Sequence, residues 1–222
     1  MGDPDIVGKI FGWTGTAICI YFFLAPVVPF LEVLKGKLNY KDSPGVLLIM
    51  SFMNCALWAD YGLVKNDFQV YFANGIGGTI TLVWITIYLI FLGKTSPCLA
   101  FVYNAGLVLI VIGLMLLFYF IVSMTMTGYC AMIFNVLMYA APGEKIYQIC
   151  KGASYQLIPI WSTIGGTACS TSWMCYGIYQ KDIYVVIPNA LGVLASIVQI
   201  VIFVIYRRKQ KNKAQSEETT KE

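Results

Sequence analysis

The chain has 222 residues, of which 59% are apolar and only 12% are charged, and its formal net charge is +4. A soluble domain of this length cannot cover its surface with so few charges, so the composition excludes a soluble protein. The positive excess lies in the predicted loops and the tail, which argues against a nucleic-acid partner. There is no histidine, and the seven cysteines show no metal-ligand or disulfide spacing, so we expect no metal and no other cofactor.

Seven long apolar stretches follow one another along the chain, each close to the roughly 20 residues that span a bilayer. Short polar turns separate some of them, and the polar residues after Tyr206 are expected to be disordered. The fourth stretch carries no charge and is apolar on every side, which is typical of a helix that faces lipid or spaces its neighbours. The predicted helices cover residues 10–34, 44–64, 68–92, 98–123, 127–150, 157–179 and 183–206.

One pattern of six residues occurs twice, and each member of the second copy lies 115 residues after its counterpart (173 − 58 = 115). The copies are Trp58, Tyr61, Gly62, Asp67, Asn74 and Gly77, and then Trp173, Tyr176, Gly177, Asp182, Asn189 and Gly192. Ala25-Pro26 returns more faintly as Ala141-Pro142. A fixed period of this kind indicates a duplicated structural unit.

The repeat predicts an all-α integral membrane protein built as three helices, one unpaired helix and three helices. We expect a first repeat over 1–97, a linker helix over 98–123, a second repeat over 124–206 and a basic, then polar, tail over 207–222. Because the linker makes the number of crossings odd, both repeats insert the same way up. Parallel repeats of this type are a transporter plan, with the substrate bound between the halves near the bilayer midplane.

Loop charges predict the orientation of this arrangement. The positive-inside rule then places the N-terminus outside and the C-terminus in the cytosol. Most basic residues fall on one side of the seven-helix plan, namely Lys35, Lys37, Lys41, Lys94, Lys145, Lys151 and the 207–213 cluster, whereas Lys9, Lys65 and Lys181 fall on the other.

Four side chains of the repeated pattern are expected at one depth, since each lies eight residues from a predicted turn: Trp58, Asn74, Trp173 and Asn189. At about 1.5 Å per residue, that depth is about 12 Å below the turns, close to the middle of a roughly 30 Å hydrocarbon layer. An asparagine there cannot face lipid, because an unpaired amide is costly in hydrocarbon. Amides beside flat aromatic rings suit a neutral polyol.

Several blocks resemble the SWEET family of sugar transporters: residues 51–58, Tyr61-Gly62, Asn74-Gly75, 138–142, Ser172-Trp173 and 187–192. The resemblance implies facilitated diffusion of a small neutral sugar by alternating access, without catalysis. It also implies that Asn74 and Asn189 hydrogen-bond the sugar and that Trp58 and Trp173 stack on it or confine it. Four prolines would serve as cytosolic hinges, Pro26, Pro44, Pro142 and Pro159, of which Pro44 matches the family pattern least well.

The residues themselves leave other interpretations open. The asparagines could bond between helices, the tryptophans could belong to an interfacial belt, and the prolines could be static kinks within helices or ordinary helix starts. Asp60, about a turn from the end of its helix, would lie in an outer aqueous vestibule or serve as a proton site.

We expect a bidirectional uniporter for a monosaccharide such as glucose, because two indoles leave a slot for one pyranose ring. The small side chains of Ala25 and Ala141 would leave additional room for the sugar in that pocket. The alternative is a proton-coupled transporter of amino acids or other small solutes from the related PQ-loop group. The repeat argues against a seven-helix receptor, and no nucleophile–base pair or metal cluster suggests an enzyme. The plasma membrane is favoured over vacuolar or other endomembranes, with the lipid bilayer as a partner and homo-oligomerisation left open.

Overall fold

The computed structural model describes residues 4–35, 45–92, 96–138 and 140–219. Within these ranges all regular secondary structure is helical, as nine α-helices, one π-helical turn and one 3₁₀ turn. Five segments of the described residues are long and apolar enough to cross a membrane, namely Ile6–Leu24, Phe68–Ile90, Pro97–Ile121, Met124–Cys150 and Ile183–Lys213. The prediction of an all-helical membrane protein is thus confirmed.

Contacts divide the chain into two compact units, which we describe separately. The first unit is Gly12–Phe134, and the second unit is Met1–Phe11 together with Asn135–Glu222. The boundaries proposed from the repeat, at residues 98 and 124, stay predictions.

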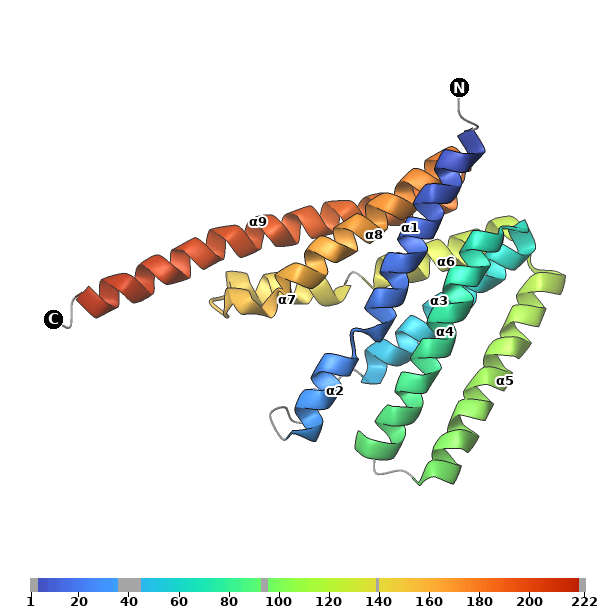
Figure 1. The fold of residues 1–222 in the computed structure, drawn as a ribbon, viewed down its shortest axis with the longest axis horizontal. Helices are drawn as coiled ribbons and strands as arrows, with labels where there is room; N and C mark the ends of the chain where they lie inside the picture. The colour runs from blue at the N-terminus through green and yellow to red at the C-terminus, as the bar shows by residue number, and fades with distance from the viewer. Residues whose placement is uncertain (1–3, 36–44, 93–95, 139, 220–222) are drawn as a thin grey trace. The chain divides into compact units, whose positions relative to one another are not determined.

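The first unit is built around three packed helices, α3, α4 and α5 (Figure 1). Phe52, Ile85 and Val111, one from each helix, are buried where the three meet. Burial of large apolar side chains is the main stabilising contribution of such a core. The unit contains α1 (Pro4–Leu24) from Gly12 onward, α2 (Val27–Leu34), α3 (Gly45–Lys65), α4 (Phe68–Ile87), the π-helical turn Tyr88–Leu92, α5 (Pro97–Ile121) and most of α6 (Met124–Leu137).

The second unit is built around the α8–α9 hairpin, whose two helices lie side by side in Figure 1. The start of α1 packs on it. The Phe11 ring stacks on Tyr179 with ring centroids 6.0 Å apart, and the Ser172 hydroxyl donates to the Phe11 carbonyl at 2.9 Å. The helices of this unit are α7 (Ala140–Cys150), the 3₁₀ turn Tyr155–Leu157, α8 (Ile160–Tyr179) and α9 (Ile183–Thr219).

Two of the predicted helices are broken. The first predicted helix divides into α1 and α2, with Ala25 and Pro26 in the turn between them, and the fifth divides into α6 and α7. Proline lacks the N–H that would continue the helix and its ring clashes with the preceding turn. Pro142 lies in the first turn of α7, where proline is readily accommodated. The prediction that Pro26 and Pro142 lie within continuous helices is therefore wrong.

The disordered tail predicted after Tyr206 is also wrong, because α9 continues to Thr219. Residues 207–219 contain no glycine or proline and consist largely of lysine, arginine, glutamine, glutamate and alanine, which favour helix. The Gln210 amide also holds this part of α9 to the segment before α8. It donates to the Ala153 carbonyl at 2.8 Å and accepts from the Tyr155 N–H at 3.3 Å.

Candidate functional site

The same connection joins α3 to α4 and α8 to α9. Asn66 and Lys181 both take the left-handed conformation, with φ of 59° and 54°. In each case the next residue's N–H bonds to the carbonyl five residues back, from Asp67 to Gly62 at 2.7 Å and from Asp182 to Gly177 at 2.8 Å. These bonds form a Schellman motif, which satisfies carbonyls that a helix end leaves free.

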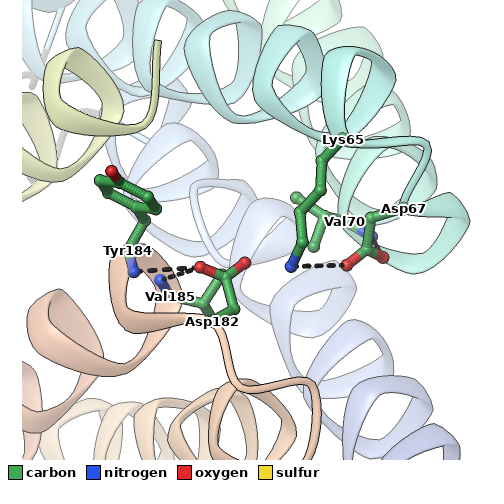
Figure 2. A network of polar contacts seen from close by, with 6 residues as sticks. All are labelled: Lys65, Asp67, Val70, Asp182, Tyr184 and Val185. Carbon is green, nitrogen blue, oxygen red and sulfur yellow. Dashed lines mark hydrogen bonds and ion pairs between the residues drawn. The ribbon is translucent and has the colours of Figure 1, made fainter. Parts of the chain in front are cut away.

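The two aspartates then cap the following helices (Figure 2). The Asp67 Oδ1 accepts from the Val70 N–H at 3.3 Å, and the Asp182 Oδ1 accepts from the N–H groups of Tyr184 and Val185 at 3.0 and 3.4 Å. Such a cap stabilises a helix by about 0.5–2 kcal/mol. Asp67 and Asp182 are therefore structural members of the repeated pattern.

The tyrosine–glycine pair of the pattern is also structural. A Cβ on Gly62 would lie 2.6 Å from the Tyr71 nitrogen, and one on Gly177 would lie 2.9 Å from Val186 Cγ2. Only glycine allows the two helices of each hairpin to approach so closely. The neighbouring Tyr61 and Tyr176 are buried, so this part of the pattern closes the hairpin.

The two tryptophans of the pattern are buried against those tyrosines. Trp58 is 5% exposed and Trp173 is 8% exposed. Each indole meets the tyrosine of its own helix edge to face, with centroids 5.7 Å apart for Trp58 and Tyr61 and 5.4 Å apart for Trp173 and Tyr176. A tryptophan of an interfacial belt presents its ring to the headgroup region, so this burial argues against the belt interpretation.

Asn74 and Asn189 occupy matching places on α4 and α9. Each donates one amide N–H to the carbonyl four residues back, Asn74 to Val70 at 2.8 Å and Asn189 to Val185 at 2.7 Å. Within the described ranges neither amide bonds to another helix, which argues against the helix–helix interpretation. The second N–H and the side-chain oxygen of each half-buried amide remain available to a ligand.

Those of the remaining predicted site residues that the structure describes lie at helix boundaries. Pro159 is the N-cap residue of α8, and its carbonyl accepts from the Thr163 N–H at 3.0 Å. Ala25 is exposed in the turn after α1, and Ala141 is the second residue of α7. Pro44 lies outside the described residues. The described ranges contain no group of three or more His, Cys, Asp or Glu residues that could hold a metal ion.

A family model described as "Sugar efflux transporter for intercellular exchange" matches residues 9–96 and again residues 124–211. The two matches are themselves 115 residues apart, and together they cover most of the chain. The chain belongs to the SWEET family. This is a family of sugar transporters, so the chain is an integral membrane protein and not an enzyme.

Plant SWEET proteins are similar over nearly the whole chain. Bidirectional sugar transporter SWEET1a of Sorghum bicolor is 31% identical over 211 residues, which are 90% of this chain and 77% of that protein. SWEET1 of Arabidopsis thaliana is 29% identical over 209 residues, 91% of this chain and 84% of that protein. A solved eukaryotic SWEET transporter, 23% identical, has the same fold with a TM-score of 0.79, over 92% of this chain and 99% of its own.

Two features near the SWEET motif residues were missed by sequence reasoning. The Asn54 Oδ1 is buried one turn before Trp58, and neither this atom nor the Trp58 Nε1 has a partner among the described residues. The spacing of four residues was the available signal, since it places both side chains on one face of α3. The second feature is the Trp84 indole, which donates to the Phe23 carbonyl at 2.9 Å, next to the break at Pro26.

Asp60 does not lie in an aqueous vestibule, because it is only 2% exposed. It lines a cavity between α3 and α5 whose other lining residues are apolar. The water-filled surroundings proposed for it from its place near the end of the helix are therefore wrong. Its position depends on the packing of α5, a helix without any pattern that predicts its neighbours.

Proposed function

We propose that this chain is a bidirectional, facilitative transporter of a monosaccharide, with glucose as the preferred substrate. One observation carries the proposal. The hairpins account for the tyrosine, the first glycine and the aspartate of the repeated pattern, and among its other members only the tryptophan and the asparagine have a side chain that could contact a ligand. Each repeat thus contributes one buried indole and one amide with free hydrogen-bonding groups. The similar plant proteins carry the name bidirectional sugar transporter.

The proposed sugar contacts follow from the chemistry of these groups. Asn74 and Asn189 offer a donor and an acceptor each, which pair with sugar hydroxyls. The indoles of Trp58 and Trp173 supply apolar surface for the C–H face of a pyranose and limit its size. In this proposal Ala25 and Ala141 line the pocket near the helix breaks.

The proposed mechanism is alternating access between the two three-helix repeats. Helix breaks are points at which a few backbone dihedrals absorb a large movement. The proposed hinges are therefore the break at Pro26, the start of α7 beside Pro142 and the start of α8 at Pro159. Pro44, which lies outside the described residues, is the fourth proposed hinge. Along the predicted helices we expect no charged residue other than Asp60 near the depth of the asparagines, so we expect no ion to be coupled to the sugar.

The proposed topology is three helices, the linker α5 and three helices, with the N-terminus outside and the C-terminus in the cytosol. In it α3 and α8 cross the membrane as well, although they carry more polar residues than the five clearly apolar segments. Exposed apolar side chains on α5 then face lipid, among them Phe101, Leu109, Ile110, Phe120 and Ile121. The plasma membrane is the favoured location, with vacuolar or other endomembranes as alternatives.

The test is flux through the purified full-length chain in proteoliposomes, with labelled glucose, fructose, sucrose and amino acids. We expect glucose to move down its gradient in both directions, at rates unaffected by sodium or by a pH gradient. Accumulation of any solute against its gradient, abolished by a protonophore, would contradict uniport. Transport of amino acids without sugar transport would contradict the substrate.

A further inference from the structure

The basic residues that follow Tyr206 lie on a continuous helix. Residues 207–213 contain five lysines and arginines, and the first carboxylate after Tyr206 is that of Glu217. Because α9 continues to Thr219, the backbone sets the positions of these five cations around one axis. The stretch is therefore a positively charged surface of defined geometry.

The segment before α8 packs against one side of this part of α9. The Tyr155 ring meets the Phe203 ring with centroids 5.3 Å apart. The Gln210 amide bonds to the backbone of Ala153 and Tyr155, at 2.8 and 3.3 Å. These contacts determine which side of α9 is covered within the second unit and which sides stay open.

The five cations divide into two groups, one on each side of the covered strip. At about 100° per residue, Arg207, Arg208 and Lys211 lie within about 100° of one another on one side. Lys209 and Lys213 lie on the other side. All five side chains are exposed. We call the group of Arg207, Arg208 and Lys211 the arginine face.

The arginine face has no anion of its own. Among the side chains that the structure describes, no carboxylate forms an ion pair with Arg207, Arg208 or Lys211. The Arg207 guanidinium lies over the Phe203 ring, 6.0 Å from its centroid. Such a contact uses the flat side of the guanidinium and leaves the N–H groups at its edge available. Three neighbouring cations repel one another, and a bound anion would relieve that repulsion.

The arginine face lies at the level of the lipid headgroups. The segment Ile183–Lys213 is long and apolar enough to cross a membrane. From Ile183 to Arg207 the helix rises about 36 Å at 1.5 Å per residue. A bilayer has about 30 Å of hydrocarbon and about 40–45 Å in all with its headgroups. Arg207 and Arg208 therefore meet the headgroup layer, and Lys211 lies one turn further out.

We propose that the arginine face binds a phospholipid whose headgroup carries a phosphomonoester, as in the phosphatidylinositol phosphates. A phosphomonoester has a charge of about −1.5 to −2 and three acceptor oxygens, which suit two guanidinium forks and one ammonium. A phosphate on the inositol ring also projects outward from the diester phosphate, as Lys211 does from the arginines. The proposal rests on α9 crossing the bilayer and not on which solute the chain carries.

Native mass spectrometry of the purified full-length chain in detergent measures the affinity for added lipids. We expect phosphatidylinositol 4-phosphate to bind about tenfold or more tighter than phosphatidylserine, and phosphatidylcholine to bind least. The deacylated headgroup, glycerophosphoinositol 4-phosphate, should bind far more weakly than the lipid, because it lacks the chains that lie along the apolar part of α9. Equal affinity for the two anionic lipids, or for the lipid and its deacylated headgroup, would overturn the proposal.

Two double variants remove equal charge from the same stretch. Arg208→Gln with Lys211→Gln reduces the arginine face to one cation, and the affinity for phosphatidylinositol 4-phosphate should fall about tenfold or more. Lys209→Gln with Lys213→Gln is the matched control on the other side of α9, and it should lower that affinity about twofold. Equal losses in the two variants would mean that only the total charge attracts the lipid, and the proposal would then be wrong.

A third variant tests the guanidinium forks. Arg207→Lys with Arg208→Lys keeps every charge but replaces two planar forks by point charges. We expect this variant to lose most of the preference for phosphatidylinositol 4-phosphate over phosphatidylserine while it still binds both lipids. An unchanged preference would contradict the arginine contacts. All three variants change exposed side chains only, and an unchanged unfolding midpoint without lipid verifies that each is folded.

Discussion

Asn66 and Lys181, 115 residues apart, hold the same left-handed backbone conformation and end α3 and α8 with the same pair of hydrogen bonds. Asparagine tolerates this conformation, because its short polar side chain bonds locally. Lysine does not have that property. The second hairpin therefore carries a backbone strain that the first one largely avoids.

Replacing Lys181 by glycine should raise stability, because the left-handed conformation costs a non-glycine residue about 1–2 kcal/mol and the greater freedom of glycine in the unfolded chain offsets only part of the gain. The matched control is Gln180→Gly at the neighbouring residue, whose φ of −78° is ordinary. That variant should be less stable than the wild type. The measurement is the thermal unfolding midpoint of each purified protein, and a decrease in both variants would contradict the strain.

The asparagine pair gives the most direct test of the proposed sugar site. Asn74→Ala or Asn189→Ala removes donors and an acceptor from a desolvated site, at about 1–3 kcal/mol each, so transport should fall about tenfold or more per molecule in the membrane. Asn104→Ala is the matched control, since the Asn104 amide bonds to the Thr86 hydroxyl of α4 at 2.9 Å and not to a sugar. Near-normal flux in both site variants would make Asn74 and Asn189 structural.

Substrate size should be set by the indoles. With tryptophan at both positions, excess sucrose should leave glucose uptake unchanged, because a second ring has no room. Replacing both Trp58 and Trp173 by serine should allow sucrose to compete. The measurement is inhibition of labelled glucose uptake at increasing sucrose concentration, and the slot is refuted if the wild type carries both sugars equally fast.

Trp84 should stabilise the helix end next to Pro26. The Phe23 carbonyl is one of the last four of α1 and has no partner within that helix, so the Trp84 indole N–H satisfies it. Trp84→Phe keeps the ring against Phe30 but removes the donor, which should lower stability by about 1–3 kcal/mol. If this helix end is a hinge, the maximal transport rate should change more than the apparent sugar affinity.

Trp13→Phe is the matched control for that variant. Trp13 is 44% exposed and packs on Phe72 through its ring, with centroids 5.5 Å apart. Losing its N–H should change neither unfolding nor transport. Equal effects of the two substitutions would show that the Phe23 hydrogen bond is not what Trp84 contributes.

The helices and their turns could be predicted because their signals are local. The predicted helices leave turns at residues 65–67 and 180–182, and Asn66 and Lys181 lie in these turns. Whether a proline kinks or breaks a helix depends on the neighbouring helices, so the breaks beside Pro26 and Pro142 could not be predicted from the sequence. The burial of Asp60 depends on where α5 packs, and an evenly apolar helix gives no indication of its partner.

The repeated pattern contains residues of two kinds, those that form the hairpins and those proposed to contact the sugar. The sequence alone could not separate them, because all six residues repeat with the same spacing. The structure distinguishes them. Gly62 is required because Tyr71 approaches it closely, whereas Asn74 makes one hydrogen bond within its own helix and its other amide groups contribute nothing to the fold. A residue that the fold does not account for is the better candidate for a substrate contact.

The unbroken α9 offers a practical advantage for imaging. Its 37 residues extend about 55 Å, well beyond the roughly 30 Å of hydrocarbon, and Gln210 fastens the projecting part to the segment before α8. A helical fusion partner joined in phase near Thr219 would continue this rod without a hinge. A chain of 24.7 kDa would thereby gain a fiducial marker for electron microscopy that reports the orientation of the helix carrying Asn189.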